Sequence, residues 1–183
     1  MSIEIKNIVY SGTIGEKIDP KVLAEQCELI SYSPKFPSGC HIKGRKNPIT
    51  LYTSGKFILP GMKDRDDAEE CYRWLKDILK PYLKSPNYSD LSIANIVCKS
   101  DLGYQVNMNK LWLTLTSQDL DVLYELESFP GMIVRSEKAT FNVFSNGRFM
   151  ILGCRSIEDA EESDVFFKKV CPDARAEQKS RLR

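Results

Sequence analysis

Two asparagines occupy matching places in two similar stretches of the chain. Asn7 lies in the segment IKNIV, and Asn95 lies in the segment IANIV. A side-chain amide can donate hydrogen bonds to adenine N3 and thymine O2, the acceptors that A·T pairs present in the minor groove of DNA. A single asparagine more often satisfies or ends its own strand, but the matched pair favours a shared task in reading DNA.

Basic side chains recur in the same way. Lys56 follows a glycine in the segment GKF and Arg148 follows one in the segment GRF, with Lys63 and Arg155 further along at matching points. Each cation taken alone is typical of an ordinary solvated surface. Their matched placement favours contacts with the phosphates of a nucleic acid, and such binding weakens as the salt concentration rises.

Two phenylalanines stand directly before prolines, Phe36 before Pro37 and Phe129 before Pro130. An aromatic residue in such a loop is commonly a local packing anchor. The alternative is a wedge that enters between two base steps and kinks the duplex, as apolar side chains do in minor-groove binders. These residues alone leave both interpretations open.

These pairs belong to an internal repeat. The segment DAEE occurs at 67–70 and again at 159–162, an offset of 92 residues, and other matched segments keep their order at similar offsets. Chance does not readily give several matches in order, so the sequence predicts two copies of one unit. We expect repeat 1 at residues 1–88, repeat 2 at residues 89–175, and a basic C-terminal tail at residues 176–183.

The elements that must position these residues also recur. In the first unit the sequence predicts a strand over 3–11, a helix capped by Asp19 and running to about Ile30, strands near 38–46, 49–54 and 56–60, and a helix over 66–80. In the second it predicts a strand over 91–99, a helix after Ser117, strands across 131–152, and a helix from Ser156. Ser156 and Asp159 have the spacing of a capping box.

Strand periodicity separates the two faces of the predicted sheet, because alternate residues point to the same side. One set suits a core beneath the helices: Phe141, Val143, Gly147, Phe149 and Ile151, and in the first unit Leu51, Phe57 and Leu59. The other set mixes apolar groups with amides and cations: Asn142, Phe144, Asn146, Arg148, Met150 and Leu152. A sheet with helices on one side and a mixed surface on the other is typical of a binding platform.

The composition argues against several other classes of protein. The chain has 183 residues, a net charge of +1, one histidine and six cysteines. It contains no Walker, GxGxxG or HExxH motif, and His41 has no catalytic partners at a recognisable spacing, so we expect no enzyme, catalytic residue, small-molecule substrate or cofactor. No cysteines form a CxxC pair, so we expect reduced thiols and no metal site. No apolar run is long enough to span a bilayer, so we expect no membrane partner.

Over nearly its whole length, from Ile5 to about Pro172, the sequence resembles the TATA-box-binding protein core, a family that is itself a known example of minor-groove kinking. The resemblance rests on the segments NIV, FP, SGK and GMK in the first unit, and on NIV, YE, FPG, GR and Arg135 in the second. Each motif is weak alone, but the ordered set is specific. It implies an α+β fold: a two-repeat, pseudo-symmetric saddle with a curved ten-stranded antiparallel sheet and four helices on the convex face.

The resemblance also implies a set of site residues. Base contacts in the minor groove would come from Asn7, Val9, Asn95 and Val97. The intercalating wedges would be Phe36, Tyr52, Phe129 and Phe144. The phosphate contacts would be Lys35, Lys56, Lys63, Arg135, Arg148 and Arg155. Glu125 and Glu127 would dock transcription factor IIB, and transcription factor IIA is expected on the side of the first repeat.

The function implied is that of a general transcription initiation factor in the nucleus, which bends double-stranded promoter DNA, nucleates the preinitiation complex and meets TBP-associated factors. Four positions depart from the family pattern: Tyr52 for a wedge phenylalanine, Pro60 and Leu152 for base-contacting threonines, and Ser128 for a leucine. They favour, as the alternative, a related paralogue that acts mainly as a protein scaffold with relaxed or weak DNA binding. An appendage of a glycosylase or ribonuclease H is disfavoured, because both repeats are present and no catalytic domain follows.

Overall fold

The computed structural model of the protein describes residues 3–171 and 174–175, so the expected tail at residues 176–183 lies outside the described residues. The first elements along the chain are β1 (Glu4–Thr13), α1 (Pro20–Gln26), β2 (Ile30–Tyr32), β3 (Gly39–Ile42), β4 (Ile49–Tyr52), β5 (Lys56–Met62), α2 (Arg65–Leu79) and a short 3-10 helix, η1 (Lys80–Tyr82). They are followed by β6 (Ser92–Asp101), α3 (Met108–Thr116), β7 (Asp121–Leu123), β8 (Met132–Arg135), β9 (Thr140–Val143), β10 (Arg148–Cys154) and α4 (Ile157–Val170).

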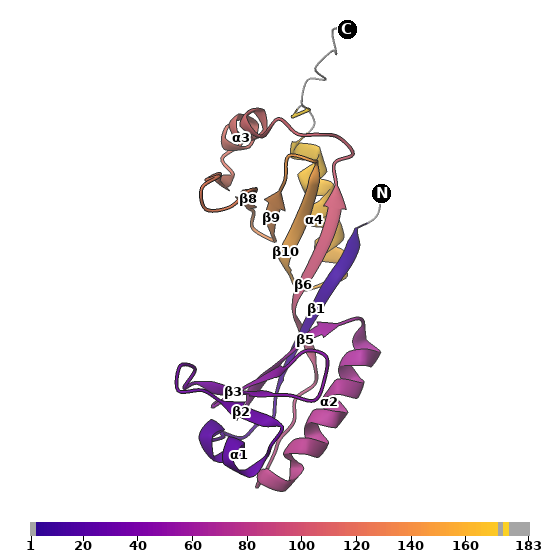
Figure 1. The fold of residues 1–183 in the computed structure, drawn as a ribbon. Coiled ribbons are helices and arrows are strands. Elements are labelled where there is room, and N and C mark those ends of the chain that lie inside the picture. The colour runs from indigo at the N-terminus through magenta and orange to yellow at the C-terminus, as the bar shows by residue number, and fades with distance from the viewer. Residues whose placement is uncertain (1–2, 172–173, 176–183) are drawn as a thin grey trace. The chain divides into compact units, whose positions relative to one another are not determined.

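The strands form one ten-stranded sheet in the order β2-β3-β4-β5-β1-β6-β10-β9-β8-β7. With four α-helices, this confirms the predicted α+β class and its ten antiparallel strands. The chain divides into two compact units (Figure 1). We call residues 7–94 the first half, and residues 95–175 together with the start of β1 the second half. Each half is described by itself below.

In each half a long helix packs on one face of the strands. α2 lies along β5 and buries Ala68, Cys71, Tyr72, Leu75 and Leu79. α4 lies along β10, and its Phe167 stacks on Phe141 of β9 with ring centroids 4.4 Å apart. The alternation predicted for the strands is confirmed, because the residues assigned to the core face are buried: Leu51, Phe57, Leu59, Phe141, Val143, Phe149 and Ile151.

The helix starts follow from local side-chain caps. Asp19 accepts hydrogen bonds from the N–H groups of Lys21 and Val22, with Pro20 in the first turn of α1. Ser156 accepts from the N–H of Asp159 at 3.0 Å, so the predicted cap of α4 is confirmed. None of the helices that the structure describes has the length and hydrophobicity needed to cross a bilayer.

Two predicted helix positions are wrong. α1 ends at Gln26, and Ile30, the expected last residue of this helix, instead begins β2 and pairs with Ile42. The helix expected after Ser117 lies before it, at Met108–Thr116, with Ser117 as its C-cap.

The local cause of the second error is Asn107. Its side chain accepts a hydrogen bond from the N–H of Lys110 and starts the helix there. Met108, Leu111 and Leu115 then recur at helical spacing and are buried. The residues after Ser117 turn back and form β7.

Candidate nucleic-acid interface

The sheet face away from the helices is open in each half and carries partly exposed apolar residues. Val9, Tyr52, Ile58 and Pro60 lie on this open face in the first half, and Val97, Phe144, Met150 and Leu152 lie on it in the second. This face is too apolar for a simple solvated surface. Its apolar residues lie among amides and cations, which is typical of a binding face.

A β-bulge positions Asn7 in the first half. The bulge places Pro60 and Gly61 of β5 opposite the single residue Val9 of β1. Gly61 has φ of 78°, a left-handed conformation that glycine adopts without strain. Its N–H donates to Asn7 Oδ1 at 2.9 Å.

The second half repeats this arrangement. Leu152 and Gly153 of β10 oppose the single residue Val97 of β6, and Gly153 has φ of 92°. Its N–H donates to Asn95 Oδ1 at 2.9 Å.

These two bonds orient both asparagine amides. A backbone N–H can only donate, so the Oδ1 end of each amide must face its glycine. Within the described residues, neither the Asn7 nor the Asn95 Nδ2 group has a hydrogen-bond partner. Each amide therefore keeps two N–H donors for another acceptor. Gly61 and Gly153 are themselves a matched pair in the sequence, so the sequence carried a signal for this arrangement. It did not show that each glycine would bond to an asparagine.

The predicted wedges lie in two pairs, each of which joins a phenylalanine in the loop before β3 or β8 to an aromatic residue at the end of β4 or directly after β9. Phe129 and Phe144 have ring centroids 5.8 Å apart with their planes at 59°. Phe36 and Tyr52 have centroids 5.9 Å apart at 71°. His41 of β3 stacks on Phe36 at 5.4 Å with its plane only 10° away, a contact that the sequence did not predict. All four predicted wedges are partly exposed.

The predicted phosphate-binding cations differ in their partners. Exposed side chains without an ion pair to any described residue are Lys35, Lys56, Lys63 and Arg155. By contrast, Arg148 Nε lies 3.9 Å from Asp101 Oδ2, and Arg135 donates to Asp121 Oδ2 at 3.0 Å. Sequence reasoning missed both aspartates. Each lies on a neighbouring strand, at the position paired with its arginine.

The loop after β7 carries the predicted partner-binding residues. Glu125 and Glu127 are both exposed, beside a hollow of about 480 Å³ lined by Tyr124 to Ser128. The Glu125 carbonyl oxygen accepts from the N–H of Phe129 at 3.0 Å and from Ser128 Oγ at 3.1 Å. Ser128 therefore holds the loop in a turn directly before the wedge Phe129.

Most of the cysteines lie in the core. All six are free thiols, and all but Cys27 are buried. Burial raises the pKa of Cys40 and of Cys98 to about 11, so both stay protonated at neutral pH. In the part of the chain that the structure describes, no three His, Cys, Asp or Glu residues are grouped to hold a metal ion.

The fold and the open face together define a protein of the TATA-binding class. A solved structure described as Methanococcus jannaschii TBP superposes with a TM-score of 0.77 and 26% identity, covering 94% of this chain and 99% of that chain. The family described as "Transcription factor TFIID (or TATA-binding protein, TBP)" matches residues 2–82 and 90–172. The chain belongs to this family of transcription factors.

Relatives of known name agree with this assignment. TATA-box-binding protein 2 of Haloferax volcanii is 32% identical over 166 residues, covering 87% of this chain and 88% of the relative. The TATA-box-binding protein of Methanothermobacter thermautotrophicus is 30% identical over 166 residues, covering 88% and 90%. These organisms are archaea, which have no nucleus, so the comparisons give no support to the expected nuclear location, which stays a prediction.

Proposed function

We propose that this chain is a transcription initiation factor that binds double-stranded promoter DNA in the minor groove and bends it. The observation that carries the proposal is the pair of asparagine amides, each held by a bulge glycine with its N–H donors on the open face. A·T pairs offer only acceptors in the minor groove, whereas G·C pairs add the guanine amino donor. Two fixed donors therefore favour A·T pairs beneath Asn7 and Asn95.

The other predicted site residues supply affinity and deformation. Phe36 with Tyr52, and Phe129 with Phe144, lie where apolar wedges could open a base step. The phosphate contacts would come from Lys35, Lys56, Lys63, Arg135, Arg148 and Arg155. Val9 and Val97, opposite the bulges, would pack against the sugar and base edges of the groove.

The test changes each asparagine to aspartate. Asn7→Asp or Asn95→Asp keeps an oxygen for the glycine N–H, so the bulge is retained, but it replaces the two donors with a carboxylate facing base acceptors. We expect affinity for an A·T-rich duplex, selected from random sequences, to fall at least about tenfold for each change, measured by fluorescence anisotropy at fixed salt.

The matched control is Asn109→Asp, the same chemical change at an exposed position of α3. It should bind as the wild type does. Wild-type affinity in both Asn7→Asp and Asn95→Asp would contradict minor-groove recognition by this face.

The proposed partners are transcription factors IIA and IIB and TBP-associated factors. Glu125 and Glu127 are exposed on the loop after β7, which suits docking of a basic surface of a factor IIB homologue. Charge reversal of both glutamates should reduce the ternary complex in a gel shift while binding to DNA alone is unchanged. Normal ternary complex formation would remove this loop from the proposal.

A second candidate is a paralogue that acts mainly as a protein scaffold. It is favoured by the ion pairs that occupy Arg135 and Arg148, and by Pro60 and Leu152, which have no side-chain hydroxyl for base contacts. This candidate expects weak, sequence-independent binding with no bend. Selection from random duplexes, with the salt dependence and bend angle recorded, separates it from the first.

A further inference from the structure

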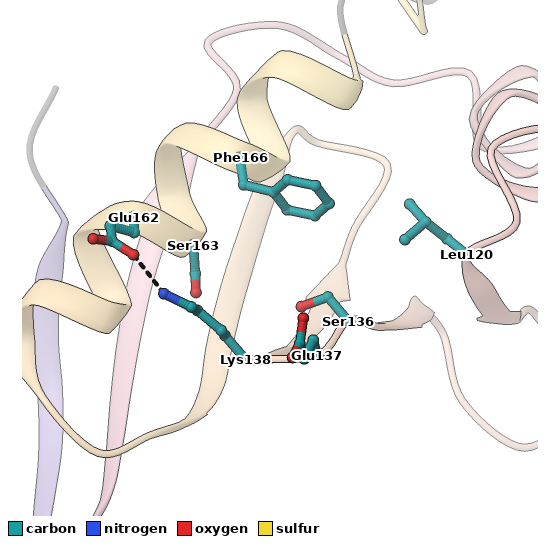
Figure 2. Close-up of a pocket in the computed structure, with 7 residues that line it drawn as sticks. All are labelled: Leu120, Ser136, Glu137, Lys138, Glu162, Ser163 and Phe166. Atoms are coloured by element: carbon teal, nitrogen blue, oxygen red, sulfur yellow. Dashed lines mark hydrogen bonds and ion pairs between the residues drawn. The ribbon is translucent and has the colours of Figure 1, made fainter.

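The second half has an open hollow beside α4 that the proposed DNA-binding function does not use. It has a volume of about 380 Å³ (Figure 2). Phe166 of α4 and Leu120, just before β7, point into it, and Ser136 and Glu137 of the β8–β9 turn border it. The Phe166 side chain is left 38% exposed although its ring lies 6.4 Å from that of Phe141 in the core.

The first half has the same place filled by its own arginine. Arg45, in the β3–β4 turn, lies over the ring of Trp74 of α2 with Cζ 5.9 Å from the ring centroid. Its two terminal nitrogens donate to Glu70 Oε1 at 3.1 and 3.2 Å. Gly44 lies so close that a Cβ there would be 2.9 Å from the Trp74 ring. In the first half, therefore, the Arg45 guanidinium covers the aromatic ring and binds the carboxylate.

The repeat offset shows what the second half lacks. At an offset of 92 residues, Phe166 corresponds to Trp74 and Glu162 to Glu70, but Glu137 corresponds to Arg45. The ring and the carboxylate are kept while the arginine is replaced by a residue of opposite charge. The neighbouring cation is Lys138. Its Nζ forms an ion pair with Glu162 Oε2 at 2.7 Å and lies 3.9 Å from Asp159 Oδ1.

We propose that this hollow binds an arginine side chain from a basic segment of a partner protein. The guanidinium would lie over Phe166 and pair with Glu137 and Glu162, as Arg45 lies over Trp74 and pairs with Glu70 within the first half. Arginine suits the site better than lysine, because its planar group stacks on an aromatic ring while its N–H groups bind carboxylates. Its aliphatic stem would cover Leu120.

The surrounding charge and hydrophobicity fit such a segment. Glu158, Glu161 and Glu162 are exposed along α4, and Glu137 adds a further carboxylate from the turn. Among the described residues that line the hollow, Lys138 is the one cation, and Lys168 and Lys169 follow in the last turn of α4. Val165, next to Phe166 on α4, is 68% exposed and would meet an apolar residue of the partner. A segment that alternates arginine with leucine or isoleucine matches this surface in both respects.

The test uses the full chain and a short fluorescein-labelled peptide of leucine, serine and arginine, beside the same peptide with lysine for arginine. Anisotropy should show the arginine peptide binding about tenfold more tightly than the lysine peptide. Phe166→Ala should remove this preference. Equal binding of the two peptides, or no binding of either, would overturn the proposal.

The sharper variant is Glu137→Arg, which restores the arginine at the position of Arg45. The new arginine should fill the hollow from within the chain. It should therefore lower the affinity for the arginine peptide by at least about tenfold. Glu161→Arg is the matched control, since it makes the same charge reversal at an exposed residue of α4 that does not line the hollow. If both variants lost the same affinity for the arginine peptide, the change in net charge would explain the loss. That result would contradict a defined arginine site. Neither change touches the predicted DNA-binding residues, so DNA affinity should stay within about twofold.

Discussion

The two halves have the same order of elements but present different chemistry on the open face. At matched positions of two antiparallel strand pairs, Lys56 of β5 is paired with Thr13 of β1, whereas Arg148 of β10 is paired with Asp101 of β6. The first half therefore presents a cation beside a neutral hydroxyl, and the second presents a cation beside a carboxylate. The comparison shows that equal positions in a repeat do not imply equal contributions to phosphate binding.

For the aromatic pairs, it is the second half that is better suited to bind DNA. In the second half, Phe129 lies against Phe144, and neither side chain has a polar atom to desolvate. In the first half, Phe36 contacts Tyr52 and His41, which both carry polar atoms. We infer that the first half contributes more by charge and the second half more by wedging.

The largest expected effect comes from the wedges. Phe129→Ala should lower DNA affinity by at least about tenfold and reduce the bend, because unstacking a base step costs a few kcal/mol that the wedge must offset. Phe36→Ala should reduce both by less. Energy transfer between the ends of a short labelled duplex measures the bend. A wild-type bend in Phe129→Ala would leave this phenylalanine as a packing anchor only.

An intermediate effect should follow from moving a single carboxylate between the halves. Asp101→Asn frees Arg148 for a phosphate, so affinity should rise about threefold and the salt dependence should steepen by up to about one contact. Thr13→Asp places a carboxylate beside Lys56 and should do the reverse. The Arg148–Asp101 pair is exposed, so thermal stability should change little in Asp101→Asn. Equal salt slopes in the wild type and both variants would contradict the charge difference between the halves.

The smallest effect should come from the tyrosine hydroxyl. Within the described residues, the Tyr52 hydroxyl has no hydrogen-bond partner, and inserting it into a base stack would remove its water. A buried unpaired hydroxyl costs roughly 1–3 kcal/mol, although water at the edge of the groove reduces this cost. Tyr52→Phe should therefore keep or raise affinity, by up to about threefold, in the same anisotropy assay. A clear loss of affinity would mean that the hydroxyl bonds to DNA.

Local order in the sequence was sufficient to predict much of the fold. Strand alternation placed Phe57 and Phe149 in the core, and the Ser156 cap placed the start of α4, because both depend on residues that are near in the chain. The end of α1 and the position of α3 were predicted wrongly, although α3 has a local signal in its Asn107 cap. The two asparagines and the four wedge residues were named as site residues from the internal repeat and from the family resemblance.

What the sequence by itself determined was therefore the repeated unit, its periodicity and the residue types on each face. The tertiary structure decided which of these residues meet. Gly61 is 54 residues from Asn7, and Glu70 is 25 residues from Arg45, so each contact depends on strand register or helix packing. The same register brings Asp101 beside Arg148, and the turn composition leaves Phe166 open where Trp74 is covered. Such pairings depend on strand register, where a shift of one residue would move each side chain to the other face.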